Sequence, residues 1–352
     1  MAPGRERSDP PLALTMGDPA GIGPEITIKA FVQRSGELIE PFALYADPEA
    51  LTARARLLGI DVPVTVISDP SEARAAFRIS LPVIKIALAA RTEPGKPDPA
   101  NGAATIAAIE RATADAAAGK VRAMITNPIA KSVLYQAGFP HPGHTEFLAA
   151  LADLHWPGHR HHPVMMLACD TLRVVPLTIH VALSKVPALI TRPLIFETVR
   201  VTWEALRRDF GIEAPRIAIA GLNPHAGEGG SIGREDADII APAIRDLRAE
   251  GFQVTGPHSA DTLFHAAARK NYDAAVAMYH DQALIPIKTL AFDEGVNVTL
   301  GLPFVRTSPD HGTAFDIAAE GRASAVSLIA ALKMADAMAA RRAAHPSLAH
   351  HA

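Results

Sequence analysis

The sequence predicts an α/β protein with two α/β/α domains and a mostly parallel sheet, and three observations support this. Short apolar runs alternate with helical segments, which is typical of parallel sheets with helical crossovers. Several of these runs end in polar or glycine-rich turns, which is where open α/β sheets bind ligands. The 352 residues can bury a large core and favour two domains over one.

Composition and charge exclude several classes of protein. The chain is 49% hydrophobic and 20% charged, and its formal net charge of −3 gives no reason to expect a nucleic acid or an anionic membrane as partner. The single cysteine, Cys169, excludes an internal disulfide. No stretch approaches the ~20 consecutive apolar residues of a membrane span, and the N-terminus has no apolar signal region. We therefore expect a soluble, cytoplasmic protein.

The first half of the chain alternates expected strands and helices behind an N-terminal arm. Residues 1–11 lack an apolar run, so we expect a flexible arm there. Glycines in Met16–Glu25 permit a tight strand-to-helix turn, but their spacing is not the GxGxxG dinucleotide fingerprint. The expected strands are Leu12–Thr15, Phe42–Tyr45, Val64–Ile67 and Val121–Ile125. The expected helices are Pro24–Gln33, Pro48–Leu58 and Ala103–Ala118.

The second half continues the alternation. A helix is expected to begin near Thr145, and Asp310–Ala314 is expected to cap another. Pro286 is expected to force an extended path between Asp281 and Lys288. The expected strands are Val164–Ala168, Leu172–Ile179, Arg216–Ala220, Phe252–Thr255, Ala274–Met278 and Val296–Leu300. The expected long helices are Val186–Phe210, Glu235–Glu250 and Ala323–Arg342.

Three histidines share one placement along the chain. His180, His225 and His280 each follow an expected buried strand directly or within a few residues. Parallel strands bring their carboxyl ends to one edge, and three neutral imidazoles suit Zn²⁺ or a related ion acting as Lewis acid. A hydrogen-bonded core histidine is the alternative for each one taken alone. The histidine-rich segment 155–162 lacks a regular scaffold and is interpreted as a solvated loop.

Basic side chains at further strand ends are candidates for binding an anionic substrate. They are Lys131, Lys288 and Arg306, each in or near a strand-end loop. His144 and Thr145 at a helix start could add donors, helped by the exposed amides there. A solvated surface charge is the alternative for any single one of them.

Seven motifs occur in order along the chain. They are MGDPAGIGPEI, TNPIAK, GHTEFLA, GLNPHAGEGGSIGRED, GPHSADTLF, AMYHDQALIPIK and GVNVTLGLPFVRTSPDHGTAFDIA. With these motifs, the chain resembles the 4-hydroxythreonine-4-phosphate dehydrogenase family of pyridoxal phosphate biosynthesis from about Leu12 to Ala340. GDPAGIGPE and HGTAFDIA also resemble motifs of isocitrate and isopropylmalate dehydrogenases. This implies a similar two-domain fold that binds NAD or NADP in its own way.

The resemblance implies a role for each matching residue. It implies one divalent metal (Zn, Mg or Co) at a homodimer interface, held by His180, His225 and His280 from both subunits. The implied substrate-binding residues are His144, Thr145, Lys288, Asn297 and Arg306. The implied catalytic residues are Lys288, which is the candidate base, and Asp281 and Asp261, near the metal or the substrate amine. The implied cofactor-binding residues are His311, Gly312, Thr313, Ala314 and Asp316.

The expected domains follow from the same assignment. Residues 12–125 plus 290–342 would form a first α/β domain on the cofactor side. Residues 126–289 would form a second α/β domain with the metal and the dimer interface, and residues 343–352 a flexible tail.

The implied reaction is the oxidation of 4-phosphooxy-L-threonine at C3 by NAD⁺ or NADP⁺, followed by decarboxylation to 3-amino-2-oxopropyl phosphate. Two alternatives stay open. A relative could oxidise another phosphorylated hydroxy acid, such as a phosphothreonate or a phosphoerythronate. A metal-dependent aldolase or phosphohydrolase would also use three histidines and an anion site, but it would turn over without a dinucleotide.

Overall fold

A computed structural model describes residues 9–141, 143–158 and 161–344, and it confirms the α/β class. The chain divides into two compact units. The first unit comprises Met1–Arg160 and Pro303–Ala339, and the second His161–Leu302 and Ala340–Ala352. The boundaries differ from those expected at 125/126 and 289/290. Residues 126–160 fall in the first unit because helix α4 (Gly102–Ala117) packs against α5 (Lys131–Gln136) and α6 (His144–His155). Residues 1–8 of the expected arm and 345–352 of the expected tail lie outside the described residues.

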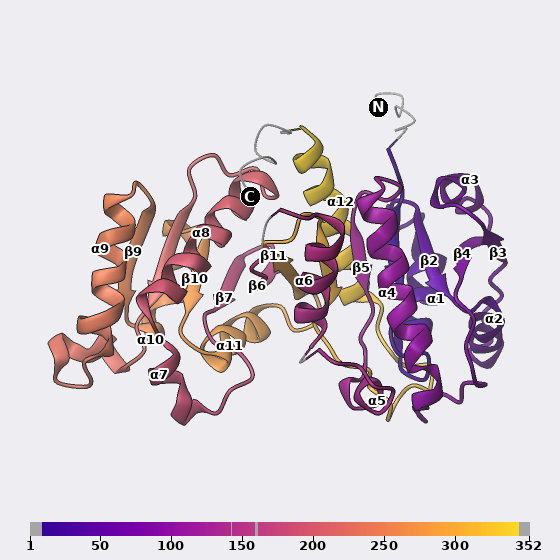
Figure 1. The fold of residues 1–352 in the computed structure, drawn as a ribbon, viewed down its shortest axis with the longest axis horizontal. Helices are drawn as coiled ribbons and strands as arrows, with labels where there is room; N and C mark the ends of the chain where they lie inside the picture. Colours follow the sequence, from indigo (N-terminus) through magenta and orange to yellow (C-terminus); the bar gives the residue numbers. More distant parts are fainter. Residues whose placement is uncertain (1–8, 142, 159–160, 345–352) are drawn as a thin grey trace. The chain divides into compact units, whose positions relative to one another are not determined.

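The first unit is built on parallel strands in the order β3-β4-β2-β1-β5-β12 (Figure 1). Every residue of β1 and β2 is buried, which is typical of strands covered by helices on both faces. The strands are β1 (Leu12–Thr15), β2 (Phe42–Ala46), β3 (Val64–Ile67), β4 (Leu81–Lys85), β5 (Met124–Thr126) and β12 (Arg306–Pro309). The helices are α1 (Gly23–Gln33), α2 (Pro48–Leu57), α3 (Ala73–Ala76), α4 (Gly102–Ala117), α5 (Lys131–Gln136), α6 (His144–His155) and α12 (Val326–Ala344, to Ala339 in this unit).

The second unit contains strands in the order β11-β6-β7-β10-β8-β9. β6 pairs antiparallel with both β11 and β7, whereas β7, β10, β8 and β9 run parallel. The strands are β6 (Val164–Cys169), β7 (Leu172–Pro176), β8 (Arg216–Ala220), β9 (Gln253–His258), β10 (Ala274–Ala277) and β11 (Val296–Leu300). The helices are α7 (Val186–Leu189), α8 (Arg192–Arg208), α9 (Ala241–Ala249), α10 (Ala260–Leu263) and α11 (His280–Leu290).

This topology places the three candidate histidines at one edge of the second unit. β10 lies between β7 and β8 and is parallel to both, and all four of its residues are buried. The carboxyl ends of β7, β8 and β10 lead to His180, His225 and His280, so the strand-end placement expected from the sequence is present. Among the described residues, no helix has the length and apolar character needed to cross a membrane.

Two helical predictions were wrong. Asp281 and Lys288 are joined by α11 and not by an extended segment, although Pro286 lies inside that helix. A proline costs about 3 kcal/mol in a helix interior, but α11 buries Ala283 and Ile287 in the core, and this burial offsets the cost. The expected helix Val186–Phe210 is interrupted before α8, because Thr191 caps α8 by accepting a hydrogen bond from Leu194 N.

Two strands were not expected, and one expected helix is absent. β12 is fully buried despite its sequence RTSP, since Thr307 Oγ1 donates to Ala331 O at 2.9 Å. β4 contains Pro82, a residue that argues against a strand when only the sequence is considered. The structure has turns in place of the helix expected after Asp310–Ala314, and the last helix begins at Val326.

Candidate active site

His180 and His280 lie side by side in the second unit. Their ring centroids are 5.7 Å apart, with an interplanar angle of 42°. Both line a cavity of about 260 Å³ with Tyr279 and Asp281. His280 Nδ1 is 2.8 Å from Asp281 Oδ1, which leaves Nε2 for another contact. A carboxylate on one imidazole nitrogen is the usual companion of a histidine that binds metal through the other.

His225 is not part of this pair. It is exposed in the loop after β8, and its charge contributes to a lowered pKa of Asp261, whose main cause is the hydrogen bond from Ser259. Within residues 9–141, 143–158 and 161–344, no group of three or more His, Cys, Asp or Glu side chains is arranged to hold a metal ion. One chain thus brings two of the three predicted ligands together.

The candidate loops have unusual backbone conformations. His180 has φ = 50° and His225 has φ = 52°, values that non-glycine residues rarely adopt. Ala226 and Glu228 follow with φ of 52° and 42°. Such conformations cost on the order of 1–3 kcal/mol each and concentrate at functional sites. The strain supports a functional assignment for both histidine loops.

The remaining candidate residues of the second unit are dispersed around this pair. Lys288 lies eight residues beyond His280 on α11, a rise of about 12 Å, and its Nζ is 5.2 Å from the Phe292 ring centroid. Asp261 is exposed at the start of α10, and Asn297 is partly buried in β11. The structure therefore does not bring Lys288 directly beside His280 in one chain.

A separate polar cluster lies in the first unit, around Arg306. The Arg306 side chain is buried, and its Nη2 donates to Thr126 Oγ1 at 2.6 Å and approaches His144 Nδ1 at 3.4 Å. Burial lowers the pKa of Arg306 to about 10, so the guanidinium stays charged at neutral pH. Because an arginine only donates, His144 Nδ1 is the acceptor, and the proton of the neutral ring is assigned to Nε2.

The start of α6 completes this cluster. His144 and Thr145 are its first two residues, and Gly143 precedes them as an extended N-cap without a side-chain hydrogen bond. A Cβ atom at Gly143 would lie 3.3 Å from Lys131 Nζ, so the lysine is adjacent. Among the described residues, buried His144 Nε2 has no hydrogen-bond partner. A buried guanidinium, a lysine, a neutral imidazole donor and a helix N-terminus together form a candidate site for a phosphate or carboxylate.

We expect His144 to make stability dependent on pH. Burial and the charges of Arg306 and Lys131 hold the pKa of His144 well below its usual range. Below the unfolded pKa of about 6.5, the unfolded chain therefore binds a proton at His144 that the folded chain does not bind. The contribution of His144 to the free energy of unfolding is thus complete above that pH and is lost as the pH falls. The urea midpoint should decrease from about pH 7 to 5, and decrease less in His144→Gln. Equal decreases in the two proteins would contradict this account.

The segments GDPAGIGPE and HGTAFDIA meet in the first unit. Thr313 O accepts a hydrogen bond from Ile22 N at 3.0 Å, and a Cβ at Gly21 would lie 2.9 Å from that same oxygen. Arg54 is buried and donates to Gly21 O, Pro19 O and Ala318 O at 3.0, 3.2 and 3.3 Å. The segment that contains His311, Gly312, Thr313, Ala314 and Asp316 is thus held against the glycine-containing turn.

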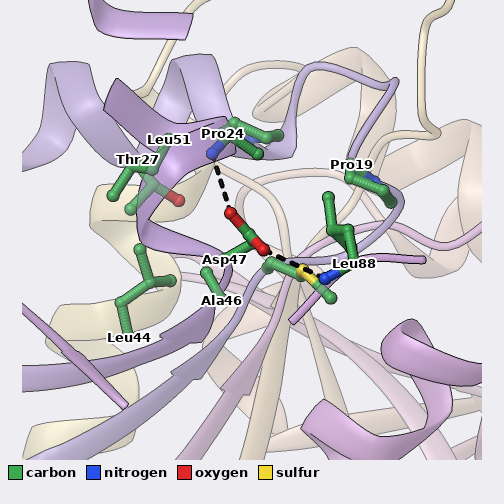
Figure 2. A pocket seen from close by; sticks show the side chains of 10 residues that line it. Pro19, Pro24, Thr27, Leu44, Ala46, Asp47, Leu51 and Leu88 are labelled. Atoms are coloured by element: carbon green, nitrogen blue, oxygen red, sulfur yellow. Dashed lines mark hydrogen bonds between the residues drawn. The ribbon is translucent and has the colours of Figure 1, made fainter. Parts of the chain in front are cut away.

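Asp47 occupies the position of the acidic residue in a dinucleotide fingerprint, directly after β2. Its Oδ1 accepts from Ala50 N at 2.9 Å and its Oδ2 from Leu88 N at 3.0 Å (Figure 2). With Pro19 and Pro24 it lines a cavity of about 20 Å³, and with Arg54 and Arg91 it lines a larger cavity of about 780 Å³. Asp47 here caps α2, which agrees with the absence of GxGxxG.

Several residues of these clusters were not predicted as site residues. Thr126 contacts Arg306, and it begins the TNPIAK motif but was given no role in the site. Arg54 joins the Met16–Gly23 turn to the segment around Thr313 and lies outside the seven motifs. In the histidine-rich segment, His155 ends α6, whereas His159 lies outside the described residues.

Comparisons with known proteins place the chain in a family. The family model described as "Pyridoxal phosphate biosynthetic protein PdxA" matches residues 37–335. A 4-hydroxythreonine-4-phosphate dehydrogenase of Methylorubrum populi is 56% identical over 336 residues, which cover 95% of each chain.

Solved structures agree with this relationship. The 4-hydroxythreonine-4-phosphate dehydrogenase of Klebsiella pneumoniae matches with a TM-score of 0.83 and 39% identity, over 94% of this chain and 100% of that chain. A terephthalate 1,2-cis-dihydrodiol dehydrogenase of Burkholderia xenovorans matches with a TM-score of 0.62 and 30% identity, over 94% and 98% of the two chains. The chain therefore belongs to the PdxA family of pyridoxal phosphate biosynthetic proteins.

Proposed function

We propose that this chain is a dehydrogenase that oxidises 4-phosphooxy-L-threonine at C3 with NAD⁺ or NADP⁺ and releases CO₂ to give 3-amino-2-oxopropyl phosphate. The observation that carries the proposal is the 56% identity, over 95% of each chain, to the Methylorubrum protein named 4-hydroxythreonine-4-phosphate dehydrogenase. The polar cluster around Arg306 supports a substrate with a phosphate and a carboxylate, since this cluster offers a buried guanidinium and an imidazole donor to an anionic group.

One divalent metal ion would be held by His180, His225 and His280. The paired imidazoles and the carboxylate on His280 fit such an ion, and nitrogen ligands favour Zn²⁺ or Co²⁺ over Mg²⁺. When bound, the ion supplies Lewis acidity, which lowers the pKa of the substrate alcohol and polarises the carbonyl that replaces it.

The active enzyme is proposed to be a cytoplasmic homodimer with ligands from both subunits. The second unit has large apolar side chains that are exposed on α11, just after α11 and near His180. They are Val181, Leu183, Ile285 and Phe292, at 42%, 65%, 65% and 72%. A second copy that covers them would remove apolar surface from water beside the histidine pair.

The chain's own residues have distinct tasks in this reaction. Arg306, His144, Thr145 and Asn297 bind the anionic and polar groups of the substrate, and the neutral His144 donates from Nε2. Lys288 is the candidate base for the C3 hydroxyl proton, and Asp281 orients His280. Asp261 is proposed to act near the substrate amine or the metal. His311–Ala314 and Asp316 would hold the dinucleotide, whose nicotinamide would accept the hydride from C3. The resulting β-keto acid loses CO₂ as the new carbonyl accepts the electron pair.

A dehydrogenase for another phosphorylated hydroxy acid is the second candidate. The Burkholderia relative, named for a different substrate, is 30% identical over 94% of this chain, so the fold is compatible with more than one alcohol. An aldolase or phosphohydrolase is less compatible with the family, because neither needs a dinucleotide.

The substrate assignment is tested by measuring the initial rates of NADH and NADPH formation. We expect 4-phosphooxy-L-threonine to give a kcat/KM at least tenfold above those of phosphothreonate and phosphoerythronate, with CO₂ released in equal amount to the reduced dinucleotide. A preference for phosphothreonate would replace the substrate assignment. Substrate consumption without any dinucleotide would exclude the dehydrogenase.

A further inference from the structure

The strand ends that carry the three histidines are joined by a chain of hydrogen bonds. Thr178 Oγ1 donates to Met278 O at 2.8 Å, which links the end of β7 to the end of β10. Met278 N donates to Gln282 Oε1 at 2.6 Å, and Gln282 Nε2 donates to Gly221 O at 2.9 Å, which links β10 to the loop after β8. Thr178, Met278 and Gly221 each lie two to four positions before a candidate metal ligand.

Gln282 is the side chain that spans two of these strand ends. It is the third residue of α11, two positions after His280, and its oxygen accepts from the residue before the helix N-cap, much as a capping box does. Its amide nitrogen reaches the carbonyl at the start of the His225 loop. A single amide therefore bridges the segments that carry His280 and His225, just beyond the paired ends of β10 and β8.

The His225 loop itself is folded around a buried carboxylate. Asp236 is 1% exposed; its Oδ1 accepts from Leu222 N at 2.8 Å and its Oδ2 from Asn223 N at 3.1 Å. Asn223 Nδ2 also donates to Asp236 Oδ2 at 2.9 Å. A Cβ at Gly221 would lie 2.7 Å from Asp236 Oδ1, so the loop closes tightly over the carboxylate.

The placement of Asp236 is itself unusual. It begins a π-helical turn, Asp236–Ile240, and such turns occur frequently at functional sites. The loop that it holds contains the left-handed residues His225, Ala226 and Glu228. Because those conformations are unfavourable, the surrounding contacts must hold them, and the Asp236 carboxylate supplies three hydrogen bonds at the start of the loop.

We propose that Gln282 and Asp236 are positioning residues that set the geometry of the metal centre: Gln282 fixes the spacing of the His280 and His225 segments, and Asp236 fixes the fold of the His225 loop. The inference rests on the proposed function, since it presumes that these histidines bind a metal. Residues that orient metal ligands typically change metal affinity by about 10- to 100-fold when replaced.

The test is a Co²⁺ titration of the full-length, chelator-stripped protein, followed by the visible absorption of the bound ion, which reports its coordination geometry. Gln282→Met removes both hydrogen bonds, whereas Gln282→Glu keeps the acceptor for Met278 N and loses only the donor to Gly221 O. Asp236→Asn keeps the shape of the side chain. Gln253→Met and Asp246→Asn are matched controls, because both residues are exposed and lie outside the site, on β9 and α9.

We expect the Kd for Co²⁺ to rise at least tenfold in Gln282→Met, Gln282→Glu and Asp236→Asn, with an altered absorption spectrum and unchanged controls. The thermal unfolding midpoint of the metal-free proteins reports the purely structural effect. Lower midpoints with an unchanged Kd and spectrum would overturn the positioning role. If His225→Ala loses Co²⁺ binding but the Gln282 and Asp236 variants keep the Kd of the unmodified chain, the positioning role is also overturned. The proposed function would then stand. If His225→Ala binds Co²⁺ like the unmodified chain, the proposed metal centre itself fails.

Discussion

Replacing His225 with alanine is expected to remove both the bound metal and the dehydrogenase activity. Three imidazole ligands leave one coordination position of the metal open for the substrate. A centre that loses one imidazole keeps too few ligands to hold the ion through dialysis. The measurement is the metal content per chain after dialysis, together with kcat/KM for 4-phosphooxy-L-threonine. We expect less than a tenth of the metal and a loss of activity of at least 10³-fold.

His265→Ala is the matched control for this substitution. His265 is exposed in the same unit, and its Nδ1 is 3.4 Å from Ala268 N. Metal content and activity should both persist in this variant. Normal metal and activity in His225→Ala, or the loss of metal in His265→Ala, would show that the ligand set has been assigned wrongly.

Arg306→Met should be the most damaging change in the first unit. The buried guanidinium is the strongest anion-binding group of its cluster, and the truncation of a buried, hydrogen-bonded charge costs about 2–5 kcal/mol in binding. We expect kcat/KM to fall on the order of 10²- to 10³-fold, with the larger part in KM. Arg306→Lys should recover only part of the loss, because a lysine keeps the charge without the planar fork.

Arg56→Met controls for the removal of an arginine, since Arg56 is exposed on α2. Thermal unfolding of both variants separates misfolding from lost substrate contacts. An Arg306→Met protein with unchanged KM and kcat would exclude this cluster from substrate binding.

The parts of the site that could be predicted from the sequence are those that follow from strand periodicity. Buried runs before His180, His225 and His280 predicted strand ends, and β7, β10 and β8 are indeed adjacent and parallel. The same reasoning failed for α11, because the tertiary burial of Ala283 and Ile287 outweighs the local effect of Pro286.

The roles of Gln282, Asp236 and Thr126 could not be predicted, because these roles depend on contacts between segments that are distant in the sequence. Gln282 contacts Gly221, 61 positions away, and Arg306 contacts Thr126, 180 positions away. Asp236 and Gln282 lie within two of the seven motifs, but nothing in a single Asp or Gln indicates which distant backbone group it will contact. The pairing of His311–Asp316 with the Met16–Gly23 turn likewise appears only in the folded chain.

The most direct measurement is an anomalous diffraction experiment on crystals grown with Co²⁺ or Zn²⁺ and a nonreactive substrate analogue. The account predicts one anomalous peak per active site, bonded to His180, His225 and His280 at about 2.0–2.1 Å, with ligands from two subunits. A peak bonded to other side chains, or none in metal-containing active crystals, would contradict it.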